Sequence, residues 1–319
     1  MSQLNFVQTT GGRLIESGLD VVVTGGGGWL GQATLEMLES SLGAQLASRT
    51  HVFASSRRSM KLRSGTRLEV YPLNELSRLK IGPHLLTHFA FATREFVAQL
   101  GVAEYIARNE EITELVTGHV AKSRPVGMLV LSSGAVYLGE DLATNPYGVL
   151  KRRDERQFRK AAEESGGVGP TPRAVIPRLF NLAGPFLNKP DYVLGSIIRD
   201  IALGGPIQLH ATHPVVRSYV HVGDLVDLAF AIMMGEGPMP LEAFDTAGER
   251  EVEVGELAEL AASLLGEPGI EIRRPPLDDT PADRYVGDSA VISSLARAYG
   301  IEMRALSIQI EDTARYMRT

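Results

Sequence analysis

Tyr147 and Lys151 stand four residues apart in the stretch NPYGVLKRRDE, where the sequence predicts the start of a helix. Side chains at this spacing leave a helix on the same face. A tyrosine phenol has a pKa of about 10 in water, too high for easy proton exchange at neutral pH. A neighbouring ammonium stabilises the phenolate and lowers the pKa of the phenol. The pair is therefore predicted to act as a general acid or base.

Ser133 is the expected third member of this group. It lies in the stretch VLSSGAVY, at the end of a predicted buried strand, where its hydroxyl could bind a substrate carbonyl. The Tyr-x-x-x-Lys spacing alone is common by chance, so the upstream serine is what gives the pattern chemical meaning. We expect Ser133 to polarise a carbonyl oxygen while Tyr147 exchanges a proton with it.

A second candidate site is the glycine-rich stretch VVVTGGGGWLG, in which Gly25, Gly28 and Gly31 recur at intervals of three. These glycines follow a predicted strand and precede a predicted helix. A dinucleotide-binding fold needs a tight turn at this place, with the backbone and the helix N-terminus close to a pyrophosphate. Trp29 and Leu30 would open that helix and belong to the same cofactor site. An ordinary glycine-rich turn is the alternative, and the strand–helix context favours the cofactor.

The residues after the second predicted strand bear on which dinucleotide is bound. An acidic residue there binds the adenine ribose of NAD, whereas arginine pairs with the 2′-phosphate of NADP. The sequence has ASSRR at this point, with Ser56, Arg57 and Arg58 and no acid. A solvated basic loop is the alternative interpretation. The position favours NADP(H), with NAD(H) still possible.

These segments fall in an alternation of short apolar strands and amphipathic helices. Strands are predicted at DVVVTG, HVFASS, RLEVYP, LLTHFAFA, GMLVLSS and RAVIPRLFN, and helices over 30–42 and 94–122. The alternation predicts an α/β fold with a Rossmann-type doubly wound parallel sheet.

The C-terminal part is richer in proline and predicts a smaller substrate-binding lobe. Helices are expected over 254–266 and 305–318, with a strand over 270–276. We expect the Rossmann domain to comprise residues 19–180 and 217–247, and the smaller lobe residues 181–216 and 248–319.

Composition narrows the class of protein. The 319 residues carry a formal net charge of −6, which argues against nucleic acid as a partner. Cysteine is absent, which excludes disulfides and thiolate metal sites and predicts a cytoplasmic location. Residues 1–20 contain no apolar run long enough for a signal peptide or a membrane span, and we expect a loose extension there. His210 and His213 have no acid or cysteine cluster near them, so no metal site is predicted.

Taken together, the motifs resemble the extended short-chain dehydrogenase/reductases, specifically the sugar-nucleotide epimerase, dehydratase and reductase group. The resemblance covers nearly the whole chain from about residue 19. It rests on TGGGGWLG, THFAFATRE, SSGAVY, YGVLK, PRLFNLAGP, VRSYVHVGDLVD and RYVGDSAVISSLARAYGIE. It implies that Ser133, Tyr147 and Lys151 form a catalytic triad, in which Tyr147 and Lys151 also contact the cofactor.

The resemblance implies further ligand residues. Phe89 and Ala90 would line the cofactor, Asn181 would lie near the sugar or diphosphate, and Arg217 would bind the diphosphate of a nucleotide sugar. Asp224 is expected to cap the helix that follows it rather than to touch substrate. The helix that carries the Tyr-Lys pair commonly contributes to a dimer interface in this family, so a homodimer is expected.

Departures from the family pattern bear on the reaction. The 4,6-dehydratases place an Asp-Glu pair directly after the serine or threonine, and this chain has Gly134 and Ala135 there, which disfavours dehydration. The 4-epimerases usually keep a tightly held NAD and an acid where this chain has Ser56 and Arg57. Phe91 also replaces a residue that is usually small.

A dissociable NADPH suits a reductase better than an epimerase. We therefore expect NADPH-dependent reduction of a keto group on a nucleotide diphosphate sugar, with a 4-keto-6-deoxysugar as the expected substrate. An NAD(P)-dependent nucleotide-sugar epimerase is the first alternative. A non-catalytic nucleotide-sensing protein of the same fold is the second.

Overall fold

The main sheet of the computed structural model contains the segments predicted to bind the cofactor. The structure describes residues 4–166, 170–187, 189, 192–266 and 269–317. The strands of this sheet are β1 (Asp20–Thr24), β2 (Thr50–Ala54), β3 (Arg58–Lys61), β4 (Arg67–Pro72), β5 (His84–His88), β6 (Gly127–Val130) and β8 (Arg173–Val175).

The strand order of this sheet is β3-β4-β2-β1-β5-β6-β8. Neighbouring strands pair in parallel, except that β3 and β4 form an antiparallel hairpin at one edge. From β1 the chain builds outward through β2 and β4, then crosses back to β5 on the other side of β1. The carboxyl ends of β1 and β5 therefore meet at the switch point where open α/β sheets bind ligands.

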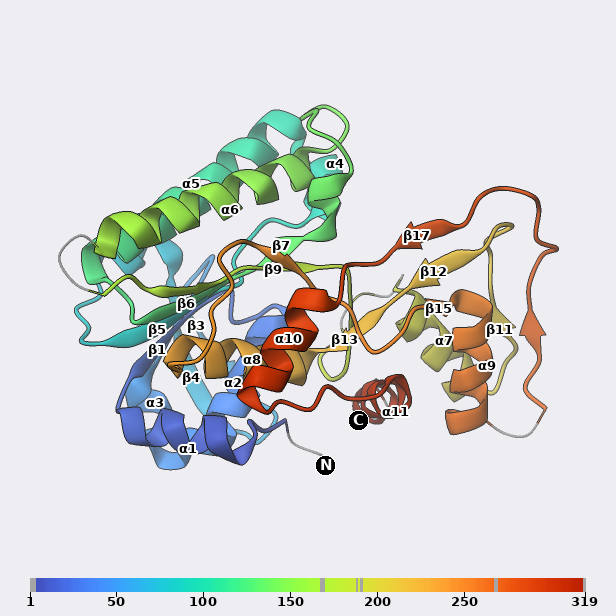
Figure 1. Cartoon of the computed structure of the whole chain (residues 1–319), viewed down its shortest axis with the longest axis horizontal. Coiled ribbons are helices and arrows are strands. Elements are labelled where there is room, and N and C mark those ends of the chain that lie inside the picture. The colour runs from blue at the N-terminus through green and yellow to red at the C-terminus, as the bar shows by residue number, and fades with distance from the viewer. Residues whose placement is uncertain (1–3, 167–169, 188, 190–191, 267–268, 318–319) are drawn as a thin grey trace.

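Helices cover both faces of this sheet (Figure 1). One face carries α1 (Gln8–Ser17), α2 (Trp29–Leu42) and α8 (Val222–Met234), and the other carries α5 (Val102–Ser123) and α6 (Pro146–Ser165). The side chains of β1 alternate between the two cores: Val21 and Val23 pack with α2 and α8, and Val22 packs with α5 and α6. The predicted α/β fold with a Rossmann-type parallel sheet is confirmed.

Two predicted segments differ in the structure. The helix predicted over 94–122 is interrupted, because Gly101 has a φ of 75° and separates α4 (Val97–Leu100) from α5. The segment for which a solvated basic loop was the alternative interpretation is partly the edge strand β3. The short helical segments are η1 (Gly43–Gln45), α3 (Leu46–Arg49), η2 (Leu73–Arg78), η3 (Arg94–Phe96), α4 (Val97–Leu100) and η4 (Gly134–Tyr137).

The N-terminal segment is packed onto the first core from Leu4 onward. Leu4, Phe6 and Leu14 are buried in that core. The N–H of Val7 donates a hydrogen bond of 2.8 Å to the Asp227 carboxylate on α8. The expectation of a loose extension was wrong for the described part of this segment, because its apolar side chains have a core to enter.

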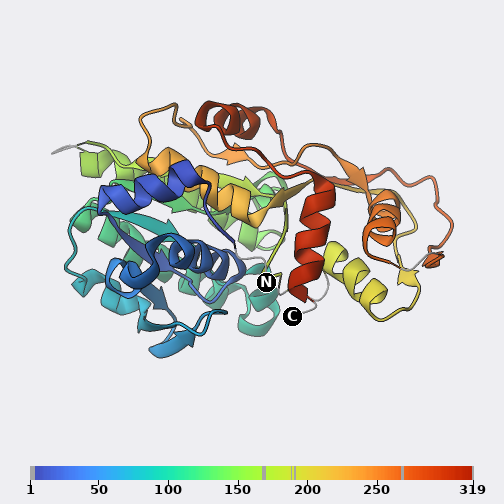
Figure 2. The ribbon, with the colours of Figure 1, turned by 90° about the horizontal axis from the view of Figure 1, so that it is seen from below.

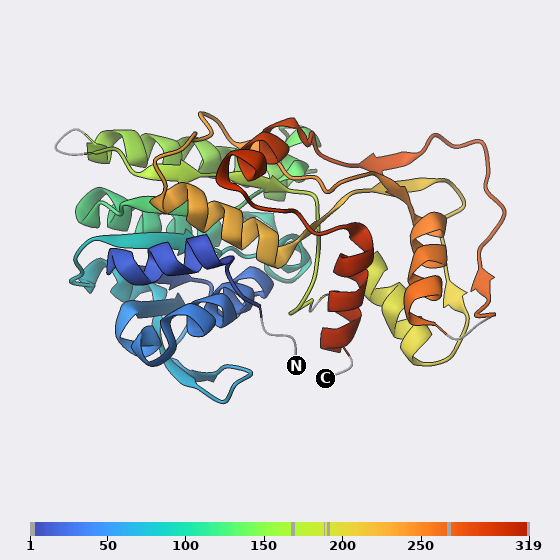
Figure 3. The same ribbon diagram turned by 60° about the horizontal axis from the view of Figure 1, so that its bottom comes forward.

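A smaller lobe extends from the sheet and is built on short strands. Its cluster is formed by α7 (Val193–Ala202), α9 (Val254–Leu265) and α11 (Leu306–Met317), which confirms the predicted smaller C-terminal lobe. Figures 2 and 3 show α11 standing between the two parts of the molecule. Its Thr313 hydroxyl accepts a hydrogen bond of 2.7 Å from the Gly184 N–H.

The remaining strands connect the two parts. They are β7 (Ser132–Ser133), β9 (Pro177–Leu179), β10 (Asn181–Ala183), β11 (Ile207–Gln208), β12 (Val215–Arg217), β13 (Tyr219–His221), β14 (Phe244–Asp245), β15 (Val252–Glu253), β16 (Ile272–Arg273) and β17 (Asp283–Tyr285). α10 (Ala290–Tyr299) packs with the first core, through Ile292 and Leu295.

The predicted domain boundaries stay a prediction. No helix in the described residues is long and apolar enough to cross a membrane.

Candidate active site

The glycine-rich turn joins β1 to α2 and lies against the end of β5. Gly25 has a φ of 77°, and a Cβ added there would lie 2.5 Å from the Ala90 backbone N and 2.6 Å from the Phe89 carbonyl carbon. A Cβ on Gly31 would overlap the Gly25 carbonyl oxygen. Glycine is therefore required at both positions by the protein's own backbone.

The N-terminus of α2 retains free N–H groups. Gly28 is the N-cap residue, and no side chain of the described residues caps the helix. The Trp29 side chain points elsewhere: its indole N–H donates a hydrogen bond of 2.6 Å to the Pro185 carbonyl. An uncapped helix N-terminus beside a tight turn can accept an anionic group such as a pyrophosphate.

The two arginines after β2 have different surroundings. Arg57 forms a 2.5 Å ion pair with Glu75 in η2, and its guanidinium lies over the Tyr71 ring. Arg58 reaches toward the glycine turn, since its Nη2 would lie 2.8 Å from a Cβ on Gly27. Within the described residues the Arg58 side chain has no hydrogen-bond or ion-pair partner. The sequence shows no acid directly after β2, but the fold brings Glu75 there.

Ser133 and Tyr147 are brought together by the packing of η4 against the first turn of α6. The Asn145 side chain caps α6 by accepting a hydrogen bond of 3.0 Å from the Gly148 N–H. A side chain at Gly148 would overlap the Ala135 carbonyl, so this close approach needs glycine. Ser133 is buried, and its hydroxyl accepts a hydrogen bond of 3.2 Å from the Ala135 N–H.

The Tyr147 phenol lies in an environment that opposes its ionisation. Burial raises the pKa of Tyr147 to about 12, while the Ser133 hydroxyl acts in the opposite direction. The ring of Phe91 packs edge-on against Tyr147, with centroids 5.6 Å apart. A nearby cation is therefore needed to lower the pKa of this phenol toward neutral pH.

Lys151 is buried one turn further along α6. Its ammonium donates a hydrogen bond of 2.9 Å to the Leu131 carbonyl and lies 3.6 Å from the centroid of the Phe91 ring. The Asp154 Oδ2 atom lies 3.8 Å from Lys151 Nζ. Burial lowers the pKa of Lys151 to about 8, and Asp154 opposes that shift. Phe91 thus contacts both members of the predicted acid/base pair.

The three residues predicted to bind substrate meet around β17. The hydroxyls of Ser133 and Tyr285 are 3.3 Å apart, and the Asn181 amide donates a hydrogen bond of 3.1 Å to the Tyr285 carbonyl. Arg217 pairs with the Asp283 carboxylate at 2.7 Å and also donates to the Asp283 carbonyl at 3.0 Å. The strand β17 therefore gathers Ser133, Asn181 and Arg217 around one short segment.

Gly134, the first of the two positions at which an acidic pair would be expected in a dehydratase, has no room for a side chain. A Cβ on Gly134 would lie 2.5 Å from the Phe180 ring. Phe180 in turn packs on Tyr285, with ring centroids 4.8 Å apart. An aromatic wall therefore occupies the space that a carboxylate at residue 134 would need.

Three residues around the site were not predicted to have a role: Asp154, Phe180 and Tyr285. Tyr285 lies within the late motif RYVGDS, so a signal for that segment was present, but nothing in it pointed to Ser133. Asp154 belongs to a charge run interpreted as a solvated helix face, yet it is buried. The hydropathy of a helix does not say which of its charges faces a neighbouring helix.

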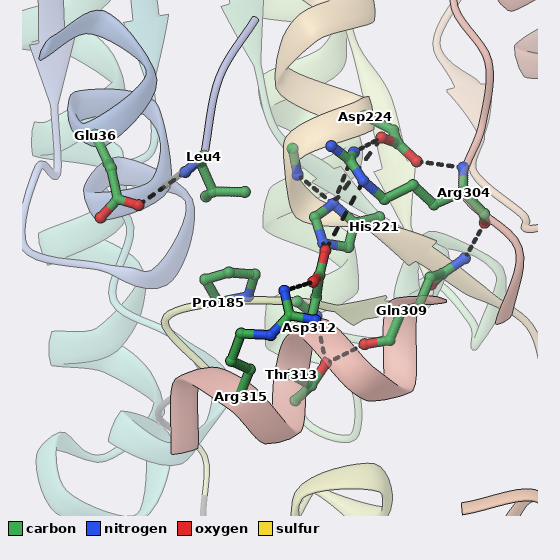
Figure 4. A network of polar contacts seen from close by, with 12 residues as sticks. Leu4, Glu36, Pro185, His221, Asp224, Arg304, Gln309, Asp312, Thr313 and Arg315 are labelled. Atoms are coloured by element: carbon green, nitrogen blue, oxygen red, sulfur yellow. Dashed lines mark hydrogen bonds and ion pairs between the residues drawn. The ribbon is translucent and has the colours of Figure 1, made fainter. Parts of the chain in front are cut away.

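A polar network holds the C-terminal segment on α8 (Figure 4). The His221 imidazole caps α8, accepting a hydrogen bond of 3.1 Å from the Gly223 N–H. Asp224 pairs with the Arg304 side chain and also accepts a hydrogen bond of 2.7 Å from its N–H. Asp312 on α11 is 3.6 Å from the other imidazole nitrogen. The expectation that Asp224 caps α8 was wrong, because its neighbour His221 takes that place.

Residues 21–238 of this chain match the sequence pattern of the NAD dependent epimerase/dehydratase family. The chain belongs to that family. The predicted resemblance to the sugar-nucleotide enzymes of the extended short-chain dehydrogenase/reductases is thereby confirmed, and membership places the chain among dinucleotide-dependent enzymes. Comparison with curated proteins finds no match.

Solved structures of several nucleotide-sugar epimerases have a similar fold. UDP-glucose 4-epimerase from Thermotoga maritima, solved with UDP-glucose, is 20% identical, with a TM-score of 0.66 over 94% of this chain and 99% of that one. UDP-N-acetylglucosamine 4-epimerase from Methanobrevibacter ruminantium is 18% identical, with a TM-score of 0.70 over 94% and 98%. UDP-glucuronic acid 4-epimerase from Bacillus cereus, solved with UDP-glucuronic acid and NAD, is 16% identical, with a TM-score of 0.68 over 94% and 99%.

In the part of the chain that the structure describes, no group of three or more His, Cys, Asp or Glu side chains is arranged to hold a metal ion.

Proposed function

We propose that this chain reduces a keto group on a nucleotide diphosphate sugar with NADPH, the expected substrate being a 4-keto-6-deoxysugar. The observation that carries the proposal is that the Ser133 hydroxyl and the Phe91 ring both contact Tyr147, that Phe91 also contacts Lys151, and that Phe180 lies beside Gly134 in place of an acid. Such a site can exchange a proton with a sugar oxygen, and it lacks the acidic pair that dehydration uses.

The residues around the switch point fit a dinucleotide. The turn at Gly25, Gly28 and Gly31 and the uncapped N-terminus of α2, at Trp29 and Leu30, suit a pyrophosphate. Phe89 and Ala90 would line the cofactor where β5 ends. Ser56 and the free guanidinium of Arg58 would bind a 2′-phosphate, with Arg57 contributing less because it is paired with Glu75. The bound dinucleotide would supply the hydride.

The catalytic roles follow from the surroundings of each group. Ser133 would donate a hydrogen bond to the sugar carbonyl, and Tyr147 would donate the proton that this oxygen needs after reduction. Lys151 would stabilise the resulting phenolate and help to hold the cofactor. Its charge matters because burial raises the pKa of Tyr147 to about 12, with the Ser133 hydroxyl acting in the opposite direction.

Asn181 and Arg217 would bind the substrate on the side of the smaller lobe. Arg217 is the group suited to a diphosphate, since a guanidinium can donate two parallel hydrogen bonds to phosphate oxygens. Its contacts with Asp283 hold it at the edge of the site in the ligand-free chain.

The proposal is tested by the dinucleotide itself. Freshly purified protein is denatured, any released dinucleotide is identified by mass, and the empty protein is titrated with NADPH and NADH. We expect an empty protein that binds NADPH more tightly and oxidises it when given a keto-sugar nucleotide. Stoichiometric NAD retained through purification would contradict the reductase and favour the alternative.

That alternative is an NAD-dependent nucleotide-sugar epimerase. It is favoured by Glu75, which stands beside Arg57 and could accept hydrogen bonds from the ribose hydroxyls of NAD. The similarity to the epimerase structures named above supports this alternative at least as well as it supports the reductase. Production of an epimeric nucleotide sugar with no net consumption of dinucleotide would establish it.

The proposed assembly is a homodimer formed through α5 and α6. These helices lie side by side on the outer face of the sheet (Figure 1) and are linked by an Arg153–Glu110 ion pair of 2.9 Å. Light scattering of the purified protein tests the dimer. The absence of cysteine also fits a reducing compartment such as the cytoplasm.

A further inference from the structure

Asp154 lies three residues after Lys151 on α6, and both residues are buried, with 4% and 5% of their surfaces exposed. Its Oδ2 is 3.8 Å from Lys151 Nζ, and its Oδ1 accepts a hydrogen bond of 2.8 Å from the Thr113 hydroxyl on α5. In the described part of the chain Oδ2 has no hydrogen-bond partner. A buried carboxylate requires a counter-charge, and Lys151 supplies it.

The next residue shows why Asp154 rather than Glu155 plays this part. Glu155 is also buried, but Arg178 binds both of its oxygens at 2.8 Å and the Ser132 hydroxyl donates to it at 2.5 Å. Its charge is thus already balanced by a guanidinium. Asp154 is the carboxylate beside Lys151 that has no arginine of its own among the described contacts.

The other titratable groups around the pair come from β5, α5 and α6. His88, at the end of β5, is neutral, because burial and the charge of Lys151 lower its pKa to about 3. On α5, burial raises the pKa of Tyr105 and keeps that phenol neutral. Tyr147 on α6 is also protonated at neutral pH. None of these three groups supplies a negative charge to Lys151.

We propose that Asp154 is a positioning residue that keeps Lys151 protonated and oriented, so that Tyr147 can exchange its proton near neutral pH. This inference rests on the proposed roles of Tyr147 and Lys151. Thr113 orients the carboxylate from α5, so the packing of two helices determines the charge state of the site.

The direction of the pH effect follows from the balance at Lys151. Burial lowers the pKa of Lys151 to about 8, and the facing Asp154 limits that decrease. The ammonium is charged below this pH and neutral above it. Without the Asp154 charge, the pKa of Lys151 falls further and the ammonium is lost at a lower pH. The alkaline limb of the activity profile therefore moves toward neutrality.

The experiment observes Lys151 directly in the full-length protein. The chain has six lysines, which are Lys61, Lys80, Lys122, Lys151, Lys160 and Lys189. Protein labelled with ¹³C at the lysine Cε is titrated by NMR, and a Lys151→Arg variant assigns the Lys151 signal. We expect Asp154→Asn to move the midpoint of this titration down by on the order of 1 pH unit. An unchanged midpoint overturns the proposal.

Asp227→Asn is the matched control. Asp227 is likewise buried and lies on α8 against the N-terminal segment, and within the described residues one of its oxygens is hydrogen-bonded and the other is not. It should lower stability without moving the Lys151 midpoint. Should Asp154→Asn fail to fold, Thr113→Val removes only the hydroxyl that orients the carboxylate. The same downward shift, smaller in size, is expected, and its absence contradicts the proposal.

Failure of this inference differs from failure of the proposed function. A shifted midpoint in a protein that turns over no nucleotide sugar supports the Asp154–Lys151 pairing and contradicts the proposed reaction. An unshifted midpoint in an active enzyme contradicts the role of Asp154 and leaves the reaction in place. In an active enzyme, the alkaline limb of kcat should move with the Lys151 midpoint.

Discussion

The two halves of the candidate site are built in different ways. The cofactor half is made of β1, the glycine turn and the start of α2, which are adjacent in the chain. The substrate half joins Ser133 to Tyr285, which are 152 residues apart in the sequence. The first half presents backbone groups and needs glycines, while the second presents side chains held by long-range contacts. Substitutions in the two halves should therefore have different effects.

The largest effect is expected at the phenol proposed to be catalytic, where the halves meet. Tyr147→Phe removes the proposed proton donor and should lower kcat by ~10²- to 10⁴-fold. Dinucleotide affinity should stay nearly unchanged, because the glycine turn and the start of α2 are untouched. Stopped-flow oxidation of NADPH and calorimetric titration measure the two quantities. Normal turnover by this variant would sink the assignment.

Gly25→Ala tests the backbone character of the cofactor half. The added methyl would lie 2.5 Å from the Ala90 N, at a φ of 77°. We expect the free energy of unfolding to fall by about 1–3 kcal/mol, with weaker dinucleotide binding. Denaturant unfolding measures the change. Gly12→Ala in α1 is the control, since nothing lies within 4 Å of its Cβ position, and it should not destabilise. Equal losses of unfolding free energy in the two variants would show that Gly25 has no special backbone requirement.

The arginines after β2 test which dinucleotide the first half reads. Arg58→Gln should weaken NADPH binding by about 10-fold and leave NADH binding nearly unchanged, because it removes a charged partner of the 2′-phosphate. Arg57→Gln should have a smaller effect, since Arg57 is already engaged with Glu75. Fluorescence titration with both dinucleotides gives the ratio of NADPH affinity to NADH affinity for each variant. Unchanged NADPH affinity in both variants would favour NAD and the epimerase.

The smallest effect is expected in the substrate half. Tyr285→Phe removes the hydroxyl that faces Ser133 at 3.3 Å and should lower kcat/KM by about 5-fold, the value of one neutral hydrogen bond. Steady-state kinetics measure it. Tyr299→Phe is the matched control, because its hydroxyl bonds the Pro238 carbonyl away from the site. A loss as large as that of Tyr147→Phe would instead make Tyr285 a proton donor.

Local patterns predicted the parts of the site that lie close together in the chain. The turn at Gly25 and the Tyr147–Lys151 pair were expected where the structure has them, because the periods of strand and helix fix which neighbours share a face. The pairing of Arg57 with Glu75 was not expected, since it depends on how β2 and η2 are brought side by side. The same holds for Asp154, whose environment is set by α5.

Residue types and spacing alone were enough to indicate an α/β chain with a glycine turn, a Ser-Tyr-Lys group and basic residues after the second strand. Such features follow from short-range geometry and from the chemistry of each side chain. Only the folded chain could place Tyr285 on Ser133, Phe180 against Gly134 and Asp154 beside Lys151. Those contacts depend on the packing of distant segments, and packing determines which buried charges meet and how strongly each one is held.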